Sequence, residues 1–323
     1  MNDLNRRRAL QALSLPLLPG TALAQAWPDK PLKLVVGFAP GGGTDVLARL
    51  VAQHLGQRLG QPVVVDNRPG ANMIVGSEAV AKAPPDGLTL GMVAVPTVTN
   101  PSLYSKLPFD TTRDFTWITQ LTTSSLVLLA NKSVPANTIQ DVIAMAKKEP
   151  DKLAYGSSGA GGSIHLSGVL LEKMAGIQMI HVPYKGNGPA MTDLLGGRLQ
   201  FMFADIPQVA AQIKEGAVKA IAVSTLRRSA AMPDVPTIAE TGLAGYDVAV
   251  WYGVCGPAGL PRNVVSTLAR ELREVVQMPA VREQLGKWGV TPVGSSPEEF
   301  EGFIKAELAK WSGTIRSAGI KLD

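Results

Sequence analysis

Two glycine-rich segments carry the residues of this sequence that are best suited to chemistry. The first glycine loop covers residues 38–45, with the sequence FAPGGGTD, and the second covers residues 155–163, with the sequence YGSSGAGGS. Each follows a short apolar run and precedes a stretch with helical spacing. A helix start leaves backbone N–H groups unpaired and carries partial positive charge, so it can hold an anion. Neither loop contains Lys or Arg, which favours a small carboxylate over a nucleotide.

The candidate ligand-binding residues lie in these loops and after other predicted strands. Around the two loops they are Ala39, Pro40, Gly41, Gly42, Gly43, Thr44, Asp45, Ser157, Ser158, Gly159, Gly162, Ser163 and His165. Those that follow other predicted strands are Pro96, Thr97, Tyr184, Lys185, Gly186 and Asp205.

Four charged or titratable candidates also have a structural interpretation. Asp45 beside an anion site is unfavourable unless it points away, so we expect it to favour the helix start and to pair with Arg49. A helix N-terminus disfavours protonation of His165, which predicts a neutral ring that is either a ligand partner or a structural residue. Lys185 either neutralises a distal carboxylate or is a solvated turn residue. Asp205 either faces the ligand or is a helix N-cap followed by proline.

The elements around the first glycine loop alternate between strand and helix. Residues 32–36 form an apolar strand, and residues 45–59 form an amphipathic helix that Gly60 ends. Its apolar face is predicted to hold Val46, Leu47, Leu50, Val51, Leu55 and Leu59. Strands at residues 63–66 and 88–95, with a helix at 73–83 between them, complete a β-α-β-α-β order. This order predicts a parallel sheet with helices on both faces.

A second α/β unit is predicted around the second glycine loop. Ser163 is expected to be the N-cap of a helix that runs to residue 174 and is ended by Gly176. The other predicted elements of this unit are strands at 126–130, 153–155, 178–182, 199–203 and 220–224 and a helix at 138–148. Long helices at 264–276 and 297–315 follow, the second with an apolar core face.

Composition and the N-terminus restrict the class of protein. The chain has 323 residues and a formal net charge of +5 without a basic stripe interleaved with aromatics, so nucleic-acid binding is not expected. Residues 1–26 have the pattern of an export signal: three arginines, an apolar stretch and small residues before a cleavage site. We therefore expect a periplasmic protein, exported by the Sec or the twin-arginine route and soluble after cleavage. Cys255 is the only cysteine, so neither a lipid anchor nor an internal disulfide is expected.

Three motifs of nucleotide-binding proteins and hydrolases are partly present, but each lacks a required residue. Gly43 stands where a phosphate-binding loop needs lysine, and Val46 and Ile164 stand where the dinucleotide fingerprint needs its third glycine. Ala160 replaces the last glycine of a nucleophile elbow. The three histidines, none with metal-ligand spacing, are His54, His165 and His181. We therefore expect no metal, no cofactor and no enzyme activity.

Several short motifs, taken in order, resemble one known family. They are WPDKP at 27–31, PGGGTD at 40–45, NRPGA at 67–71, PDG at 85–87, GSSG at 156–159 with His165, HVPYKG at 181–186, PDVPT at 233–237 and PAG at 257–259. Together they resemble the extracytoplasmic substrate receptors of tripartite tricarboxylate transporters, also called Bug-type receptors. The chain departs from the family pattern at Asn72 and Met73, where glycines are usual.

The resemblance implies a type II periplasmic binding fold, which is an α/β fold of two doubly wound lobes joined by two crossover strands with a ligand cleft between them. Lobe 1 would combine residues 27–126 with 245–323, and lobe 2 would be residues 127–244. The implied ligand is a small di- or tricarboxylate, amino acid or aromatic acid, delivered to membrane permease subunits by a monomeric receptor. A sensor that docks a membrane signalling protein is the alternative, and a hydrolytic enzyme is a remote one.

Overall fold

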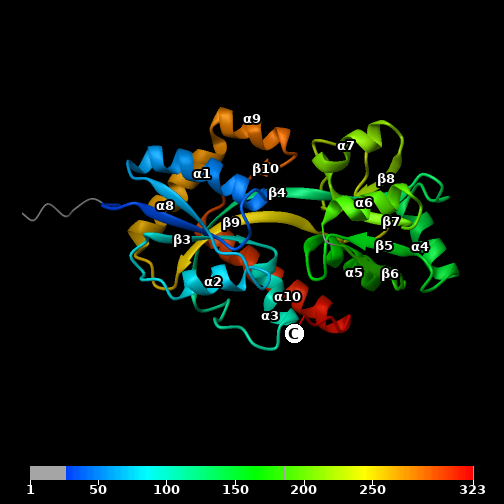
Figure 1. The fold of residues 1–323 in the computed structure, drawn as a ribbon, viewed down its shortest axis with the longest axis horizontal. Helices are drawn as coiled ribbons and strands as arrows, with labels where there is room; N and C mark the ends of the chain where they lie inside the picture. The colour runs from blue at the N-terminus through cyan, green and yellow to red at the C-terminus, as the bar shows by residue number, and fades with distance from the viewer. Residues whose placement is uncertain (1–26, 185, 323) are drawn as a thin grey trace, which may run out of the picture.

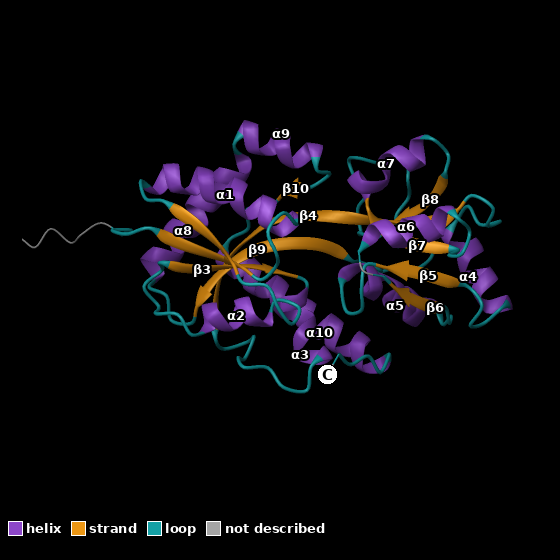
Figure 2. Ribbon diagram, in the orientation of Figure 1, coloured by secondary structure: helices purple, strands orange, loops and turns teal. Residues whose placement is uncertain are grey.

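The computed structural model describes residues 27–184 and 186–322, which form two α/β lobes side by side (Figures 1 and 2). The predicted export signal and Lys185 lie outside the described residues. The first part of lobe 1 consists of β1 (Leu32–Val36), α1 (Gly43–Leu59), β2 (Val63–Asn67), α2 (Ile74–Ala81), β3 (Thr89–Ala94), α3 (Pro96–Leu103) and the start of β4 (Phe115–Asn131).

Lobe 2 follows, and the chain then returns to lobe 1. Lobe 2 contains α4 (Ile139–Lys148), β5 (Ala154–Ser157), α5 (Ser163–Ala175), β6 (Ile180–Pro183), α6 (Asn187–Leu195), β7 (Phe201–Asp205), α7 (Ile206–Lys214) and β8 (Val218–Val223). The returning elements are β9 (Ala249–Pro257), α8 (Arg262–Gln277), α9 (Pro279–Lys287), β10 (Thr291–Pro292) and α10 (Pro297–Ser317).

Each lobe has a parallel sheet at its centre, as the strand-helix alternation predicts. In lobe 1, β1 pairs in parallel with both β2 and β3, and in lobe 2, β5 pairs in parallel with β6 and β7. The strand order is β2-β1-β3-β9-β4-β7-β5-β6. Each glycine loop follows the carboxyl end of a parallel strand, which is where ligands bind in open α/β sheets.

The antiparallel strands β4 and β9 connect the lobes (Figure 2). Residues 115–125 of β4 pair with β9, whereas residues 126–131 pair with β7 and β8 of lobe 2. At this change of partner, the buried Ser224 hydroxyl donates to the Val248 carbonyl at 2.6 Å and accepts from the Leu126 N–H at 2.9 Å. One side chain therefore ties both crossover segments together where the chain passes between lobes.

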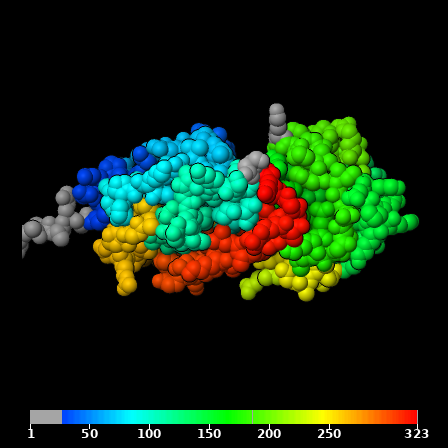
Figure 3. All heavy atoms as spheres, turned by 90° about the horizontal axis from the view of Figure 1, so that it is seen from below, coloured from blue at the N-terminus to red at the C-terminus, as the bar shows by residue number. Residues whose placement is uncertain are grey.

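Side-chain packing at α1 and α10 joins the sheets to their helices. Leu47, Val51 and Leu55 of α1 are buried against lobe 1. The predicted core face of α10 is confirmed at Phe300 and Trp311, which are fully buried, and its buried side chains belong to an apolar cluster that continues into lobe 2. The C-terminal residues accordingly lie against lobe 2 in Figure 3.

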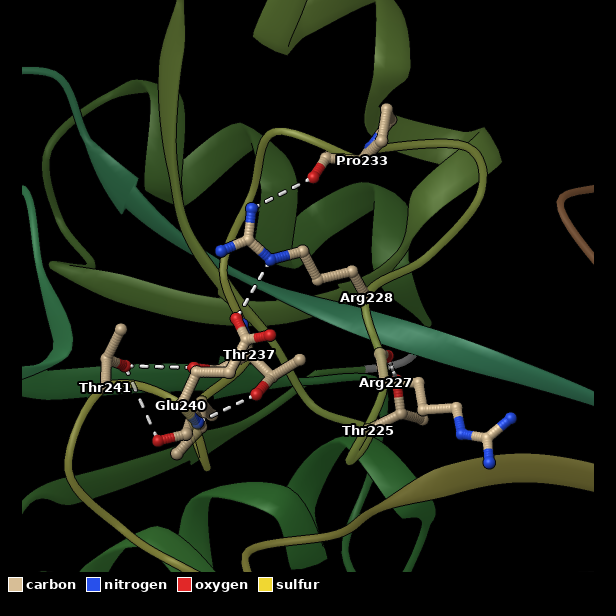
Figure 4. A network of polar contacts seen from close by, with 8 residues as sticks. Thr225, Arg227, Arg228, Pro233, Thr237, Glu240 and Thr241 are labelled. Atoms are coloured by element: carbon tan, nitrogen blue, oxygen red, sulfur yellow. Dashed lines mark hydrogen bonds and ion pairs between the residues drawn. The ribbon is translucent and has the colours of Figure 1, made fainter.

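The segment between β8 and β9 is held by a polar network (Figure 4). Arg228 donates to the Glu240 carboxylate at 2.9 Å and to the Pro233 carbonyl at 3.1 Å. Glu240 also accepts from the Thr237 N–H at 3.0 Å, and its own N–H donates to the Thr237 hydroxyl at 2.9 Å. The PDVPT motif therefore contributes to this return connection.

One local prediction differs from the structure, and one helix lies where the sequence predicted no element. Residues 96–103 form that helix, α3, although Pro101 lies within it. Gly162 occupies the N-cap position of α5, so the prediction that Ser163 is the N-cap is wrong. A glycine N-cap needs no side-chain bond to start a helix, and Ser163 becomes its first residue.

Candidate functional site

A cavity of about 420 Å³ lies between the first turn of α1 and the first turn of α7. Its floor comes from the crossover strands β4 and β9, and one wall comes from the α9–β10 connection. The lining residues are Gly41, Gly43, Val46, Leu47, Ser124, Ser125, Asp205, Pro207, Gln208, Val250, Tyr252, Leu285, Trp288 and Val290. It thus brings together three of the predicted site residues, namely Gly41, Gly43 and Asp205.

The first glycine loop closes on its own helix through Asp45. One carboxylate oxygen of this buried residue accepts from the Gly41 N–H and from Arg49 Nε, both at 2.9 Å, while the other accepts from Asn67 at 2.9 Å. The hydrogen bond from Arg49, supported by Gly41 and Asn67, lowers the pKa of Asp45 to about 2 despite burial. The expected Asp45–Arg49 pair is confirmed, and the Gly41 amide is occupied by Asp45.

The first turn of α1 also contacts a crossover strand. The Thr44 side chain is hydrogen-bonded to the hydroxyl of Tyr252 on β9. A Cβ placed on Gly43 would lie 3.6 Å from that hydroxyl oxygen. Burial, together with the nearby charge of Asp205, raises the pKa of Tyr252. The amides of Gly43 and Thr44 lack helical acceptors, because they lie in the first turn.

Asp205 supplies a carboxylate on the lobe 2 side of the cavity. It occupies the N-cap position of α7, as one interpretation of the sequence expects. Its side chain makes no capping hydrogen bond to the helix. Its carboxylate accepts from Asn187 Nδ2 at 3.4 Å, and the same nitrogen donates to Gln208 at 2.7 Å. Burial raises the pKa of Asp205. Among the described residues, Asn187 Oδ1 is buried without a hydrogen-bond partner.

The apolar part of the cavity was missed by sequence reasoning. Val46 was predicted to lie on the core face of α1, which is wrong, since its side chain is 40% exposed and lines the cavity. The first turn of α1 faces the cavity rather than the core, so helical periodicity misassigns this residue. Val250 and Trp288 each come from a separate distant element, and no local motif marks them.

The second glycine loop does not line this cavity; none of its described residues is among those that do. Ser157 is fully buried, and its hydroxyl bonds with His181 at 2.7 Å and with Gly159. Gly161, at φ +79°, packs so closely that an added Cβ would lie 2.9 Å from Leu103 of α3. The loop is therefore fitted against lobe 1.

The remaining candidates have mostly structural contacts. His165 is buried and accepts from the Gly161 N–H at 3.0 Å, as its structural interpretation expects. Thr97 is buried, and its hydroxyl accepts from the Ala94 N–H at 3.4 Å. Tyr184 donates its hydroxyl to Asp193 at 2.7 Å. Pro96 is buried at the start of α3, and Gly186, at φ +104°, precedes α6.

Comparison with known proteins agrees with this architecture. The family model described as tripartite tricarboxylate transporter family receptor (TctC) matches residues 47–320. The chain belongs to this family. Protein BugT of Bordetella pertussis is 35% identical over 301 residues, which are 93% of this chain and 92% of BugT. A UPF0065 protein in the tcbD-tcbE intergenic region of Pseudomonas sp. (strain P51) is 36% identical over 97% of this chain and 94% of its own length.

Three solved structures show the same two-lobed fold. The periplasmic binding protein BugD has a TM-score of 0.74 at 33% identity, covering 92% of this chain and 100% of that chain. R. palustris Rpa4515 with adipate has a TM-score of 0.77 at 34% identity over the same shares. MatC (Rpa3494) from Rhodopseudomonas palustris with bound malate has a TM-score of 0.74 at 30% identity, covering 89% and 99%.

Family membership confirms the predicted fold and the predicted class of protein. The fold is that of a two-lobed periplasmic binding protein, and the chain is a periplasmic solute-binding receptor rather than an enzyme. In the part of the chain that the structure describes, no helix combines the length and apolar character needed to cross a bilayer. Within that same part, no cluster of three His, Cys, Asp or Glu side chains is arranged to hold a metal ion.

Proposed function

We propose that this receptor captures a small organic carboxylate between its lobes and delivers it to the membrane subunits of a tripartite tricarboxylate-type transporter. Lobe 1 would comprise residues 27–126 and 245–323, and lobe 2 residues 127–244, in a monomeric receptor that residues 1–26 direct for export. Relatives of known structure were solved with adipate and with malate, both small dicarboxylates. The observation that carries the proposal is the cavity between the first turns of α1 and α7.

The α1 side of the cavity suits a ligand carboxylate. The amides of Gly43 and Thr44 supply unpaired donors at the positive end of the helix dipole. Asp45 does not oppose an anion there, because its charge is compensated by Arg49 and turned toward Gly41. A carboxylate held this way needs no arginine or lysine from the cavity wall.

The α7 side suits a hydrogen-bond donor on the ligand. Asp205 is a half-buried carboxylate whose ionised form is disfavoured, and an ammonium or hydroxyl group would compensate it. Asn187 and Gln208 are hydrogen-bonded next to it and supply further polar atoms. The apolar wall formed by Val46, Val250 and Trp288 suits the methylene groups in between. We infer that hydroxy acids and amino acids bind better than plain diacids.

Isothermal titration calorimetry with succinate, malate and aspartate tests this proposal, because the three differ at one carbon by hydrogen, hydroxyl or ammonium. We expect malate or aspartate to bind at least about tenfold more tightly than succinate, which corresponds to one charge-assisted hydrogen bond. Asp205→Asn should reduce this preference, whereas the exposed control Asp234→Asn should retain it. Absence of binding by all three and by a wider panel of organic acids would contradict the proposal.

A further inference from the structure

Two stacked histidines lie beside the second glycine loop and are not explained by the cavity. His165 comes from the first turn of α5, and His181 comes from β6. Their ring centroids are 3.8 Å apart with an interplanar angle of 20°, and Tyr155 lies 5.1 Å from the His181 ring. The exposed fraction of His165 is only 5%. The two rings therefore form one packed unit.

Each histidine holds a different part of the second glycine loop. The Ser157 hydroxyl lies 2.9 Å from the Gly159 carbonyl and 2.7 Å from His181 Nε2. If it donates its single hydrogen to Gly159, the bond with His181 places a hydrogen on His181 Nε2. At the other end, the Gly161 N–H donates to His165 Nδ1 at 3.0 Å, so that nitrogen carries no hydrogen. In this arrangement both rings are neutral, with the hydrogen of His181 on Nε2 and no hydrogen on His165 Nδ1.

The same rings line a second cavity, of about 450 Å³, between α5 and the C-terminal end of α10. The titratable side chains that line it besides the histidines are Tyr155 of β5 and Glu172 and Lys173 of α5; α10 and the residues after it contribute Ser317, Ala318 and Ile320. The Glu172 carboxylate accepts from the Met179 N–H at 2.7 Å and from the Tyr155 hydroxyl at 3.4 Å. Among the described residues, no carboxylate is hydrogen-bonded to either imidazole.

Burial disfavours the charged form of both rings. It lowers the pKa of His165 from 6.5 to about 3, with a contribution from His181, and that of His181 to about 4. A proton on His181 Nδ1 would leave the bond to Ser157 intact. A proton on His165 Nδ1 would remove the acceptor of the Gly161 N–H and place two positive rings in contact.

We propose that His165 and His181 are positioning residues whose neutral state holds the second glycine loop in the shape that packs against Leu103 of lobe 1, and that acidification weakens this contact between the lobes by protonating the pair and so releases the ligand. This regulation rests on the proposed function of the receptor. Since a released loop would take up protons more readily than the native one, the loop is favoured above about pH 6.5 and loses stability as pH falls. The second glycine loop would then act in ligand retention from beside the cavity.

Conservative variants separate titration from packing. His165→Asn can keep an acceptor near the Nδ1 position, and His181→Gln can keep a donor near the Nε2 position, but neither titrates. His54, the remaining histidine, lies in α1 and provides the control His54→Gln. Binding of malate, aspartate and succinate is measured at about pH 7.5 and about pH 5 for wild type, the double variant and the control.

We expect the wild type and His54→Gln to lose at least about tenfold more affinity on acidification than the double variant. Protonation of the acid probes affects all proteins equally and cancels in this comparison. Equal losses in wild type and double variant would overturn the proposal.

Nuclear magnetic resonance of the wild type gives a test that needs neither a variant nor a ligand. The nitrogen shifts should show hydrogen on His181 Nε2 and none on His165 Nδ1, and the Gly159 and Gly161 amide resonances should titrate with the histidines. The opposite tautomers, or amides that do not respond, would overturn the proposal. If no acid binds at neutral pH, the proposed function fails, while these resonances still decide the role of the histidines.

Discussion

The carboxylate of Asp45 accepts a hydrogen bond from the backbone N–H of Gly41 at 2.9 Å, so the first glycine loop is closed by the helix that it starts. The bond turns the Asp45 charge toward the loop and toward Arg49. An acidic residue can therefore stand at a helix start that faces a cavity suited to an anion. It fixes the loop and leaves the following first-turn amides unpaired.

Asp45→Ala should destabilise the protein by about 2 kcal/mol, because three hydrogen-bond donors lose one buried acceptor group. Arg49→Ala should cost less than Asp45→Ala, since the arginine side chain is 53% exposed and solvent screens its charge. Urea unfolding measures both. Because the pKa of Asp45 is lowered to about 2, its contribution should persist at neutral pH and fall as pH drops below 3.8. Equal costs for the two variants would contradict this account.

Regular local patterns allowed most of the fold to be predicted. Apolar runs give β1 and β2 directly, and left-handed glycines end α1 and α5, at φ +66° for Gly60 and +62° for Gly176. The full length of β4 was not predicted, because its partners β9, β7 and β8 lie far away in the sequence. Helix α3 was not predicted either; Pro101 lies within it, and proline is unfavourable inside a helix.

Only those site residues could be predicted that belong to a local sequence pattern, such as a glycine loop before a helix or an acidic residue at the end of a strand. Gly41 and Gly43 of the first loop and Asp205 at the end of β7 have local signals, and they meet at one cavity. Trp288 and Tyr252 reach it from distant elements, and no sequence spacing relates them. The second glycine loop resembles the first in sequence, yet Gly161 is packed against Leu103, a contact that only the tertiary structure reveals.

Gly161→Ala should destabilise the protein by at least about 1 kcal/mol, since a Cβ at φ +79° is strained and would lie 2.9 Å from Leu103 and Leu322. Gly302→Ala is the matched contrast. It lies in α10 with no atom within 4 Å of an added Cβ, so it should stabilise by about 0.5 kcal/mol. Chemical denaturation measures the free energy of unfolding of both variants. An unchanged value for Gly161→Ala would contradict the observed packing of the second loop.

Ser224→Ala should cost about 1–3 kcal/mol, because it leaves the Leu126 N–H and the Val248 carbonyl without their buried partner. The same change should broaden the distribution of lobe arrangements, which small-angle X-ray scattering of the ligand-free protein measures. Ser266→Ala, on the exposed face of α8, is the control and should change neither property. An unchanged unfolding free energy for Ser224→Ala would contradict its role between the crossover segments.

Asp205→Asn should raise the Tm of the ligand-free receptor at neutral pH by about 2 °C, since it removes a half-buried charge. The raised pKa sets the sign: the wild-type side chain favours the fold when protonated, and this contribution is lost as pH rises through its folded pKa. The advantage of the variant should therefore shrink in acid. Differential scanning calorimetry at several pH values measures it, and a lower Tm at neutral pH would contradict the account.

Trp288 should report ligand binding by fluorescence. Of the five tryptophans, all among the described residues, it alone lines the cavity beside α1 and α7. Trp288→Phe should abolish most of the ligand-dependent change in emission. Trp27→Phe is the control and should retain this change, because Trp27 lies outside the cavity, where it donates a hydrogen bond to the Asp86 carbonyl. A full response in Trp288→Phe would place the ligand elsewhere.

The crystal structure of the receptor with the tightest-binding acid among succinate, malate and aspartate tests the central claim most directly. One carboxylate of the ligand should lie at the amides of Gly43 and Thr44, and the opposite end should lie within hydrogen-bond distance of Asp205. A ligand bound in the same crystal without contact to either the first turn of α1 or Asp205 would contradict it.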